Sequence, residues 1–302
     1  MSQPTVRYQS PDEDSSRWLE FVFRPGDLII STRSKHGTTW MQMICALLVF
    51  QTPDLPAPLA ELSPWLDWLV YPHDEVLARL QAQHHRRFVK THTPLDGVPL
   101  APRAWYVVVC RDPLDAAVSL YHQRDNLDRQ RMRQLTGSTE PAGPPTPRAA
   151  LPDWLDTWID RDADPRHDLD SLPGVMHHLS DAWARRNDSN IILVRYEDLV
   201  TDLEGQMRRL ADRLGIQVPE HLWQSLVTAA GFSAMRERAG QLLPDPVGVL
   251  KDSRAFFRRG GSGAAREVLS SEQLGRYHAR VAERAPTDLL AWLHSDGTGP
   301  GP

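Results

Sequence analysis

The chain has 302 residues, enough to bury the core of one large α/β domain or two small ones. Its 34 basic and 39 acidic residues give a net charge of −5, without the basic excess typical of nucleic-acid-binding proteins. No apolar stretch approaches the roughly 18 residues of a membrane span, and the polar N-terminus lacks a signal-peptide pattern. With Cys45 and Cys110 in apolar segments far apart, these features predict a cytoplasmic protein that binds no nucleic acid.

Short apolar runs punctuate the chain at Leu28–Ser31, Arg87–Thr91, Trp105–Cys110 and Asn190–Tyr196. They are continuous rather than alternating, as expected for strands buried on both faces of a parallel sheet. Helical patterns occupy Thr39–Phe50, Pro113–Arg129 and Leu199–Leu214. This alternation predicts an α/β sandwich with its functional site at the carboxyl ends of the strands.

The segment 131–152 is rich in Pro, Gly, Ser and Thr and has no apolar period, which predicts a mobile loop or lid. It is not a domain linker, because the fourth strand still has to join the sheet. We therefore expect a single domain over residues 25–293. An N-terminal segment, residues 1–24, precedes it, and a disordered tail, residues 294–302, follows.

The junction between the first strand and the next helix reads TRSKHGTTW over Thr32–Trp40. The first backbone N–H groups of a helix are unpaired, and the helix dipole favours negative charge there. Gly37 allows the backbone to approach a ligand, and Lys35 adds a positive charge. The pattern predicts an anion site. In the Walker motif the lysine follows the glycine, but here it precedes it, which indicates a ligand other than a nucleoside triphosphate.

Further segments read FVKTHTP (Phe88–Pro94), VVVCRDPLDAAVSLYH (Val107–His122), VRYEDL (Val194–Leu199) and FFRRGGSG (Phe256–Gly263). Together with the first loop, they resemble in sequence and order the motifs of cytosolic-type sulfotransferases. These enzymes use PAPS, 3′-phosphoadenosine 5′-phosphosulfate, as sulfuryl donor. The resemblance covers about residues 25–293 and implies a P-loop NTPase-like three-layer sandwich, with a central parallel sheet flanked by helices. The heavy use of Ala, Arg and Pro suggests a bacterial member.

The resemblance implies two anion sites, one at each end of the adenosine of PAPS. It assigns donor binding to Lys35, His36, Gly37, Thr38, Thr39, Trp40, Arg111, Ser119, Tyr196, Phe232, Phe256, Phe257, Arg258, Arg259 and Gly260. The first loop would hold the phosphosulfate, and Arg111 with Ser119 would bind the 3′-phosphate. Trp40 would stack on the adenine. The alternative for Arg111 is a surface ion pair with Asp112 or Asp115.

The same resemblance makes His92 the general base that takes a proton from the acceptor hydroxyl. Lys35 would stabilise charge on the leaving oxygen, and Lys90 would stabilise charge on the transferring group. No metal is expected in this reaction. A structural role is the alternative for His92.

Three departures from the family pattern bear on donor binding. His36 replaces a small hydroxyl residue, so its ring either donates to the donor or forces the loop to shift. Ala230 removes a threonine contact, and Ala264 with Ala265 replaces an Asp-Trp pair, which weakens the expected clamp.

For the acceptor, Trp65, Trp68 and Tyr71 are expected near the mouth of the cleft. They favour a small-molecule, lipid or glycolipid acceptor, and the alternative is a helix that packs two tryptophans into the core. A homodimer is one option for assembly. Competing hypotheses are a magnesium-dependent P-loop kinase and a non-catalytic nucleotide-binding protein derived from a sulfotransferase.

Overall fold

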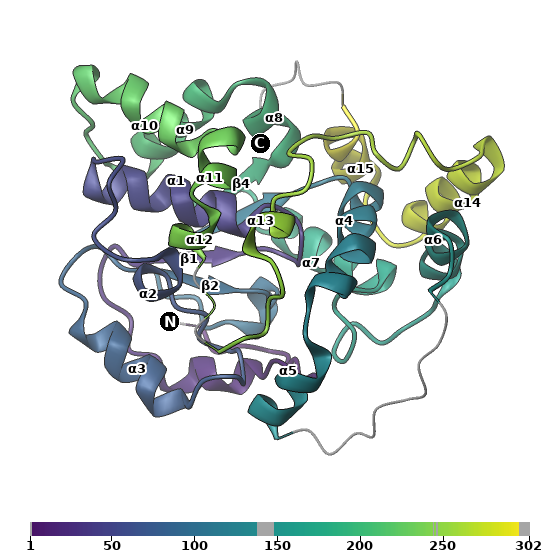
Figure 1. Ribbon diagram of the computed structural model, residues 1–302, viewed down its shortest axis with the longest axis horizontal. Helices are drawn as coiled ribbons and strands as arrows, with labels where there is room; N and C mark the ends of the chain where they lie inside the picture. Colours follow the sequence, from purple (N-terminus) through teal and green to yellow (C-terminus); the bar gives the residue numbers. More distant parts are fainter. Residues whose placement is uncertain (1, 138–147, 244, 246, 296–302) are drawn as a thin grey trace.

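The computed structural model describes residues 2–137, 148–243, 245 and 247–295 (Figure 1). Its strands are β1 (Leu28–Ser31), β2 (Phe88–Thr91), β3 (Trp105–Cys110) and β4 (Ile191–Arg195). Its helices are η1 (Ser15–Glu20), α1 (Thr38–Phe50), α2 (Leu59–Leu62), α3 (His73–Ala82), η2 (Leu95–Gly97), α4 (Pro113–Asn126), α5 (Arg129–Thr136), α6 (Leu151–Asp160), α7 (Leu172–Ala184), α8 (Tyr196–Thr201), α9 (Leu203–Leu214), η3 (Glu220–Leu222), α10 (Trp223–Ala230), α11 (Phe232–Glu237), α12 (Ala239–Leu242), α13 (Ser253–Phe256), α14 (Ser271–Ala282) and α15 (Thr287–Leu293).

The strands form one parallel sheet in the order β2-β1-β3-β4. Each of the apolar runs singled out in the sequence contains one strand, with ends that agree within one residue. Helices cover both faces of the sheet (Figure 1). The predicted α/β sandwich is confirmed.

Alternate residues of the strands enter two separate cores, one on each face of the sheet. Leu28 and Ile30 of β1 pack with α1, α9 and α10. Ile29, between them, packs on the other face with α4, α6 and α7. Because side chains alternate across a strand, both faces of the sheet need apolar residues, and this need produces the continuous apolar runs of the sequence.

The helices differ from the expected ones in two places. The helix predicted over Pro113–Arg129 ends at Asn126, because Leu127 adopts an extended conformation and pairs with Leu250. Asp128 then caps α5, a helix that occupies the start of the segment expected to be a mobile loop. Residues 138–147 of that segment lie outside the described residues. Helix α8 also interrupts the predicted Leu199–Leu214 helix, because α9 starts anew at the cap Asp202.

The N-terminal segment packs against the domain. Its backbone bonds include Ser2 N–H to the Leu100 carbonyl at 3.0 Å and Asp14 N–H to the Asp67 carbonyl at 2.9 Å. The Trp18 side chain is fully buried and donates to the Asp67 carboxylate at 3.1 Å. The segment therefore contributes to the main core. None of the helices in the described part of the chain has the length and apolarity that a membrane crossing requires.

A buried ion pair holds the amino ends of β1 and β2 together, and we expect its loss to be costly. Arg87 Nε lies 2.9 Å from Asp27 Oδ1, and both side chains are 2% exposed. Arg87→Ala leaves the buried Asp27 charge without a counter-ion, with the Arg24 N–H as its remaining donor, so the free energy of unfolding should fall by about 3–5 kcal/mol in a urea titration. The control is Arg208→Ala, which breaks the exposed Arg208–Glu220 pair. An equal fall in the free energy of unfolding in the two variants would show that the buried pair stabilises the fold no more than an exposed pair does.

Candidate active site

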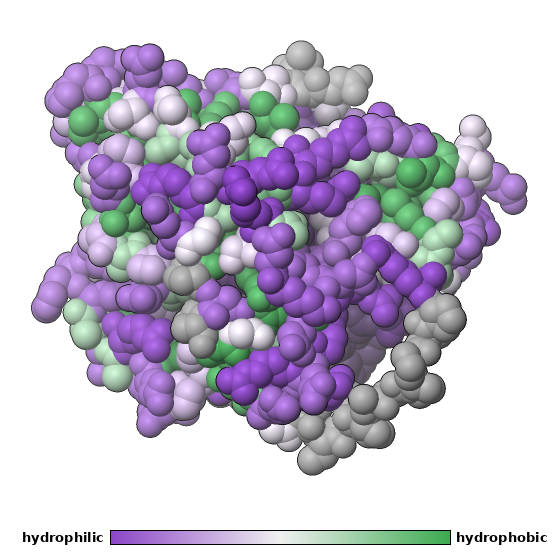
Figure 2. Space-filling view, in the orientation of Figure 1, coloured by the Kyte–Doolittle hydropathy of each residue, from purple (hydrophilic) through white to green (hydrophobic). Residues whose placement is uncertain are grey.

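A cavity of about 770 Å³ opens at the carboxyl ends of the strands. Residues that directly follow β2, β3 and β4, namely His92, Arg111 and Tyr196, line it. The face drawn in Figure 2 is largely hydrophilic, with hydrophobic residues visible between hydrophilic ones near its centre. The position of the cavity agrees with the rule for ligand sites of open α/β sheets.

The loop between β1 and α1 forms the wall of the cavity at the N-terminus of α1. Lys35 and Gly37 both have positive φ, at 65° and 102°. A Cβ atom on Gly37 would lie 2.9 Å from Cδ2 of Tyr196, so only glycine fits without a shift. No side chain caps α1, whose first turn, with Thr38 and Thr39, faces the cavity. The unpaired N–H groups of this turn are available to an anion.

Arg111 joins the two loops of the predicted donor site. Its Nη1 donates to the Lys35 carbonyl at 2.8 Å, and its Nη2 donates to the Gly261 carbonyl at 3.0 Å. The guanidinium carbon lies 4.2 Å from the centre of the Tyr196 ring, and Nη1 lies 3.4 Å from Ser119 Oγ. In the described part of the chain, no carboxylate forms an ion pair with Arg111, and its buried Nε has no partner. The positive charge of Arg111 therefore remains available to a bound anion.

The loop after α13 closes the same end of the cavity. Gly260 has a φ of 68°, and a Cβ atom there would lie 2.4 Å from the Phe232 ring. Arg258 lines the cavity, and its pKa is lowered by burial and by the charges of Arg259 and Arg111. Arg259 also lines the cavity, but its Nη2 is bound by Glu267 at 2.5 Å. Of the two arginines, Arg258 is therefore the one whose charge is not paired with Glu267.

The Asp115 carboxylate holds the end of this loop. It accepts the Gly263 N–H at 2.6 Å and the Ala265 N–H at 3.1 Å. Ala264 and Ala265 are buried. The Asp115 carboxylate thus binds the loop backbone and does not form the alternative ion pair with Arg111. These bonds anchor the loop where Ala264 and Ala265 replace the Asp-Trp pair of the family.

His92 lies at the end of β2 with 5% of its surface exposed. Its Nδ1 hydrogen-bonds the Thr32 carbonyl. Because a carbonyl only accepts, Nδ1 carries the proton and Nε2 keeps a free lone pair. Burial, and then the charges of Lys90 and Arg33, hold the pKa of His92 well below its usual value. The ring is therefore neutral at pH 7 and able to accept a proton.

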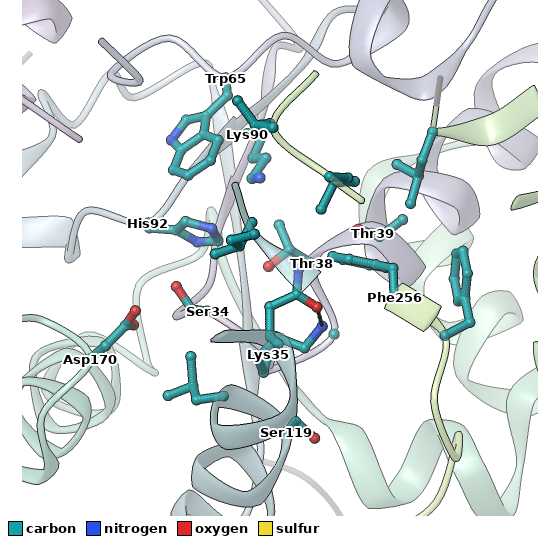
Figure 3. Close-up of a pocket in the computed structure, with 18 of the residues that line it drawn as sticks. Ser34, Lys35, Thr38, Thr39, Trp65, Lys90, His92, Ser119, Asp170 and Phe256 are labelled. Atoms are coloured by element: carbon teal, nitrogen blue, oxygen red, sulfur yellow. Dashed lines mark hydrogen bonds between the residues drawn. The ribbon is translucent and has the colours of Figure 1, made fainter. Parts of the chain in front are cut away.

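Lys35 and Lys90 point into the same space as His92 (Figure 3). Lys35 Nζ lies 3.8 Å from the centre of the Phe256 ring, and burial lowers the pKa of Lys35 to about 7. Lys90 Nζ lies 3.6 Å from the centre of the Trp65 ring, and burial lowers the pKa of Lys90 to about 8. The neighbouring cations Arg111 and Lys90 lower the pKa of Lys35 further. The site concentrates positive charge that a bound anion would stabilise.

Aromatic rings surround the space between the two anion-binding ends. Trp40 meets Tyr196 edge to face at 5.3 Å, and its Nε1 donates to the Ala230 carbonyl at 2.8 Å. Phe232 and Phe257 meet at 6.2 Å and, like Phe256, line the cavity. The Ala230 carbonyl therefore fixes the Trp40 ring, although the family's threonine side chain is absent at that position.

His36 is the one predicted site residue outside the cavity lining. Its ring is fully buried, and Nδ1 bonds the Ser34 carbonyl at 3.0 Å. Its backbone N–H donates to the Arg33 carbonyl at 3.1 Å. Burial lowers the pKa of His36 to about 4, so the ring is neutral. Neither the ring nor the backbone N–H of His36 belongs to the cavity lining. The ring is instead buried within the loop.

Trp65, Trp68 and Tyr71 line the other end of the cavity, as expected. They do not form a helix. Trp65 and Trp68 stack at 4.9 Å, and Trp65 meets the His92 ring edge to face at 4.6 Å. The motifs did not reveal other lining residues: Glu13, Ser34, Gln42, Gln123 and Asp170. Ser34 belongs to the first loop, Gln42 and Gln123 lie within predicted helices, and Glu13 and Asp170 come from segments without a local pattern. The folded chain is needed to show that their side chains reach the cavity.

The sequence contains two histidine pairs, His84-His85 and His177-His178, whose lack of spacing partners predicts surface residues and not metal ligands. The prediction of a surface position is wrong for His178. It is buried, and its Nε2 bonds Ser31 Oγ at 3.0 Å. Among the residues that the structure describes, no group of three or more His, Cys, Asp or Glu side chains is arranged to hold a metal ion.

Comparison with known families shows to which family the chain belongs. The model of the sulfotransferase domain matches residues 25–286. The chain belongs to the sulfotransferase family. A glycolipid sulfotransferase of Mycobacterium bovis is 40% identical over 317 residues, covering 98% of this chain and 96% of the relative. One from Mycobacterium tuberculosis is 40% identical over 316 residues, with the same coverage. The human sulfotransferase 2B1 is 28% identical over 285 residues, covering 87% of this chain and 68% of the relative.

Solved structures confirm the fold of this sulfotransferase. A retinol dehydratase in complex with androsterone and the inactive cofactor PAP has a TM-score of 0.69 at 22% identity, covering 95% of this chain and 86% of that one. A mouse sulfotransferase complexed with PAP has a TM-score of 0.66 at 19% identity, covering 92% and 91%. The sulfotransferase thus has the sheet and layers of known PAP-binding proteins.

Gly37→Ala should impair this sulfotransferase without removing any functional side chain. The new methyl group would meet Tyr196 at a positive φ, so we expect the free energy of unfolding to fall by about 1–3 kcal/mol, together with weaker binding of PAP. The matched control is Gly275→Ala on α14, because a Cβ atom there meets nothing within 4 Å and the residue lies outside the cavity lining. Denaturant unfolding and calorimetric titration with PAP measure both effects. Wild-type values for Gly37→Ala would contradict the requirement for glycine.

Proposed function

We propose that this sulfotransferase transfers the sulfuryl group of PAPS to a hydroxyl group of a glycolipid, with His92 as the general base. The observation that carries the proposal is the convergence of Lys35, Lys90 and His92 at the N-terminus of α1. Arg111 and Arg258 form a second basic site in the same cavity. This arrangement suits a ligand with anionic groups at both ends.

The two basic sites would orient the donor. Thr38, Thr39 and Lys35 suit the 5′-phosphosulfate, because helix N–H groups and an ammonium group bind anions well. Arg111 and Ser119 suit the 3′-phosphate, since the guanidinium group is charged and carries no ion pair in the described chain. Trp40 would lie against the adenine between them.

In the transfer step, the acceptor oxygen attacks sulfur while the bond from sulfur to the bridging phosphate oxygen breaks. His92 Nε2 takes the hydroxyl proton, as its fixed Nδ1–H tautomer permits. Lys35 stabilises the negative charge that develops on the departing phosphate oxygen of PAP. Lys90 stabilises charge on the transferring group. The products are the sulfate ester, PAP and protonated His92, which afterwards releases its proton.

The acceptor class is supported by the mycobacterial relatives, which are glycolipid sulfotransferases. One part of the cavity is suited to a lipid chain, because Leu127, Val249 and Leu250 line it and adjoin one another through the Leu127–Leu250 bridge. Met132 of α5 also lines it. A polar group at His92 and an apolar chain along α5 would together fit an amphiphile. The free, buried Cys45 and Cys110 support a cytoplasmic location.

Calorimetric titration with PAP, AMP and Mg-ATP tests the donor. We expect PAP to bind much more tightly than AMP, because only PAP carries the 3′-phosphate. Arg111→Ala should weaken PAP binding about ten- to one-hundred-fold and weaken AMP binding less, because Arg111 also holds the first loop through the Lys35 carbonyl. In assays with radiolabelled PAPS, His92→Ala should lower kcat at least about a hundred-fold while PAP affinity is retained.

Several results would count against the proposed function. Equal affinity for PAP and AMP would show that the 3′-phosphate is not recognised. Preference for Mg-ATP would favour the kinase hypothesis. PAP binding without sulfuryl transfer to any acceptor would favour a non-catalytic nucleotide-binding protein, and full turnover in His92→Ala would remove the base.

The pKa shifts predict the pH dependence of kcat/KM. His92 must be neutral, and because its pKa lies well below 6.5, the acidic limb should lie below that value. Lys35 and Lys90 must be protonated, so kcat/KM should fall as pH rises through about 7 to 8. The bound donor's negative charge raises both lysine pKa values, so the basic limb of kcat should lie at higher pH. An acidic limb above pH 6.5 would contradict the assignment of His92.

A further inference from the structure

One carboxyl group in the cavity has a position that neither the donor nor the transfer step uses. Glu13 lines the cavity but precedes the matched sulfotransferase domain. Its side chain forms no hydrogen bond or ion pair with the described residues. By contrast, two other lining carboxylates are paired, Asp170 with Arg33 at 2.6 Å and Asp168 with Arg161 at 2.7 Å.

The backbone fixes Glu13 beside the tryptophan pair. Residues 12–14 pair antiparallel with residues 67–69, with Glu13 opposite Trp68. The Asp14 N–H donates to the Asp67 carbonyl and the Leu69 N–H to the Asp12 carbonyl, both at 2.9 Å. Directly opposed residues of such a pair project to the same face, so Glu13 and Trp68 enter the cavity side by side.

This pair lies at the acceptor end of the site. Trp68 stacks on Trp65, which in turn contacts both Lys90 and the ring of His92. Trp65 therefore links the indole of Trp68 to Lys90 and His92. Trp68 is half-buried, so part of its surface is available to a ligand.

We propose that Glu13 determines acceptor specificity by binding sugar hydroxyl groups beside the one that is sulfated, while the sugar ring packs on Trp68. The inference rests on the proposed function and deepens it. A sugar presents C–H groups on its ring face, suited to an indole, and hydroxyl groups at its edge, suited to a carboxyl group. In a mostly apolar pocket, a few such polar groups fix the orientation of the ligand.

The electrostatic setting of Glu13 agrees with a neutral, hydroxyl-bearing ligand. Burial in the cavity raises the pKa of Glu13 to about 8; Asp67 and Asp170 raise it as well, while Arg33 and Lys90 oppose the shift. The protonated carboxyl group both donates and accepts hydrogen bonds, as a sugar hydroxyl does. An analogue that lacks the hydroxyl would leave this carboxyl group without a hydrogen-bond partner and would therefore bind poorly.

The test compares two acceptors that share an apolar tail, n-octyl β-D-glucopyranoside and 1-octanol, with radiolabelled PAPS. The wild type should prefer the glucoside in kcat/KM. Glu13→Ala should lower kcat/KM for the glucoside about ten- to one-hundred-fold, through KM, and leave octanol turnover and PAP affinity unchanged. Glu13→Gln keeps a donor and an acceptor and should lose less. The matched control is Glu61→Gln on α2, an exposed residue outside the cavity lining.

The alternative outcomes are distinguishable. An equal loss with both acceptors, or a loss in kcat, would give Glu13 a role in chemistry or folding and overturn the inference. A wild type without preference for the glucoside, or one that binds PAP but does not sulfate the glucoside, would also overturn it and leave donor binding intact. Failure to bind PAP would overturn the proposed function as well.

Discussion

The site depends on the hydrogen bonds by which the buried guanidinium group of Arg111 holds two distant loops together. It binds the carbonyl of Lys35 from the first loop and that of Gly261 from the last, and it lies over Tyr196. These loops are more than two hundred residues apart in sequence, and Arg111 connects them. Neutral carbonyls orient the group without neutralising its charge, and a buried charge without a counter-ion is costly. An anionic ligand would offset that cost, which links the stability of the two loops to ligand binding.

Burial, together with neighbouring positive charges, explains the protonation of the other site residues. Lys35, Lys90 and His92 all have lowered pKa values because each is buried near other cations. For His92 the shift maintains the neutral ring that a base needs. For Lys35 and Lys90 the lowered pKa disfavours the protonated form, and a bound anion would reverse this effect. Burial near other cations would thus prepare His92 for the proposed role of base and make the lysines responsive to an anionic ligand.

Two kinds of segment build the cavity. The end proposed for the donor includes Arg111 and Tyr196, which directly follow strands and are positioned by the rigid sheet, together with the loop after α13. The end proposed for the acceptor combines the N-terminal segment around Glu13, the Trp65–Trp68 loop and α5. Connecting segments vary without disturbing the sheet, which suits a fold that keeps one reaction while its acceptors change.

The sequence alone determined the strands, because burial on both faces imposes continuous apolar runs, and it placed Lys35, Lys90 and Arg111 at the strand ends through local motifs. It did not reveal that His36 is buried away from the cavity, that Asp115 anchors the loop at Ala265, or that Glu13 stands opposite Trp68. Each depends on contacts between segments distant in the chain, which no local pattern encodes. Only the tertiary structure sets such contacts, since the packing of the whole core fixes them.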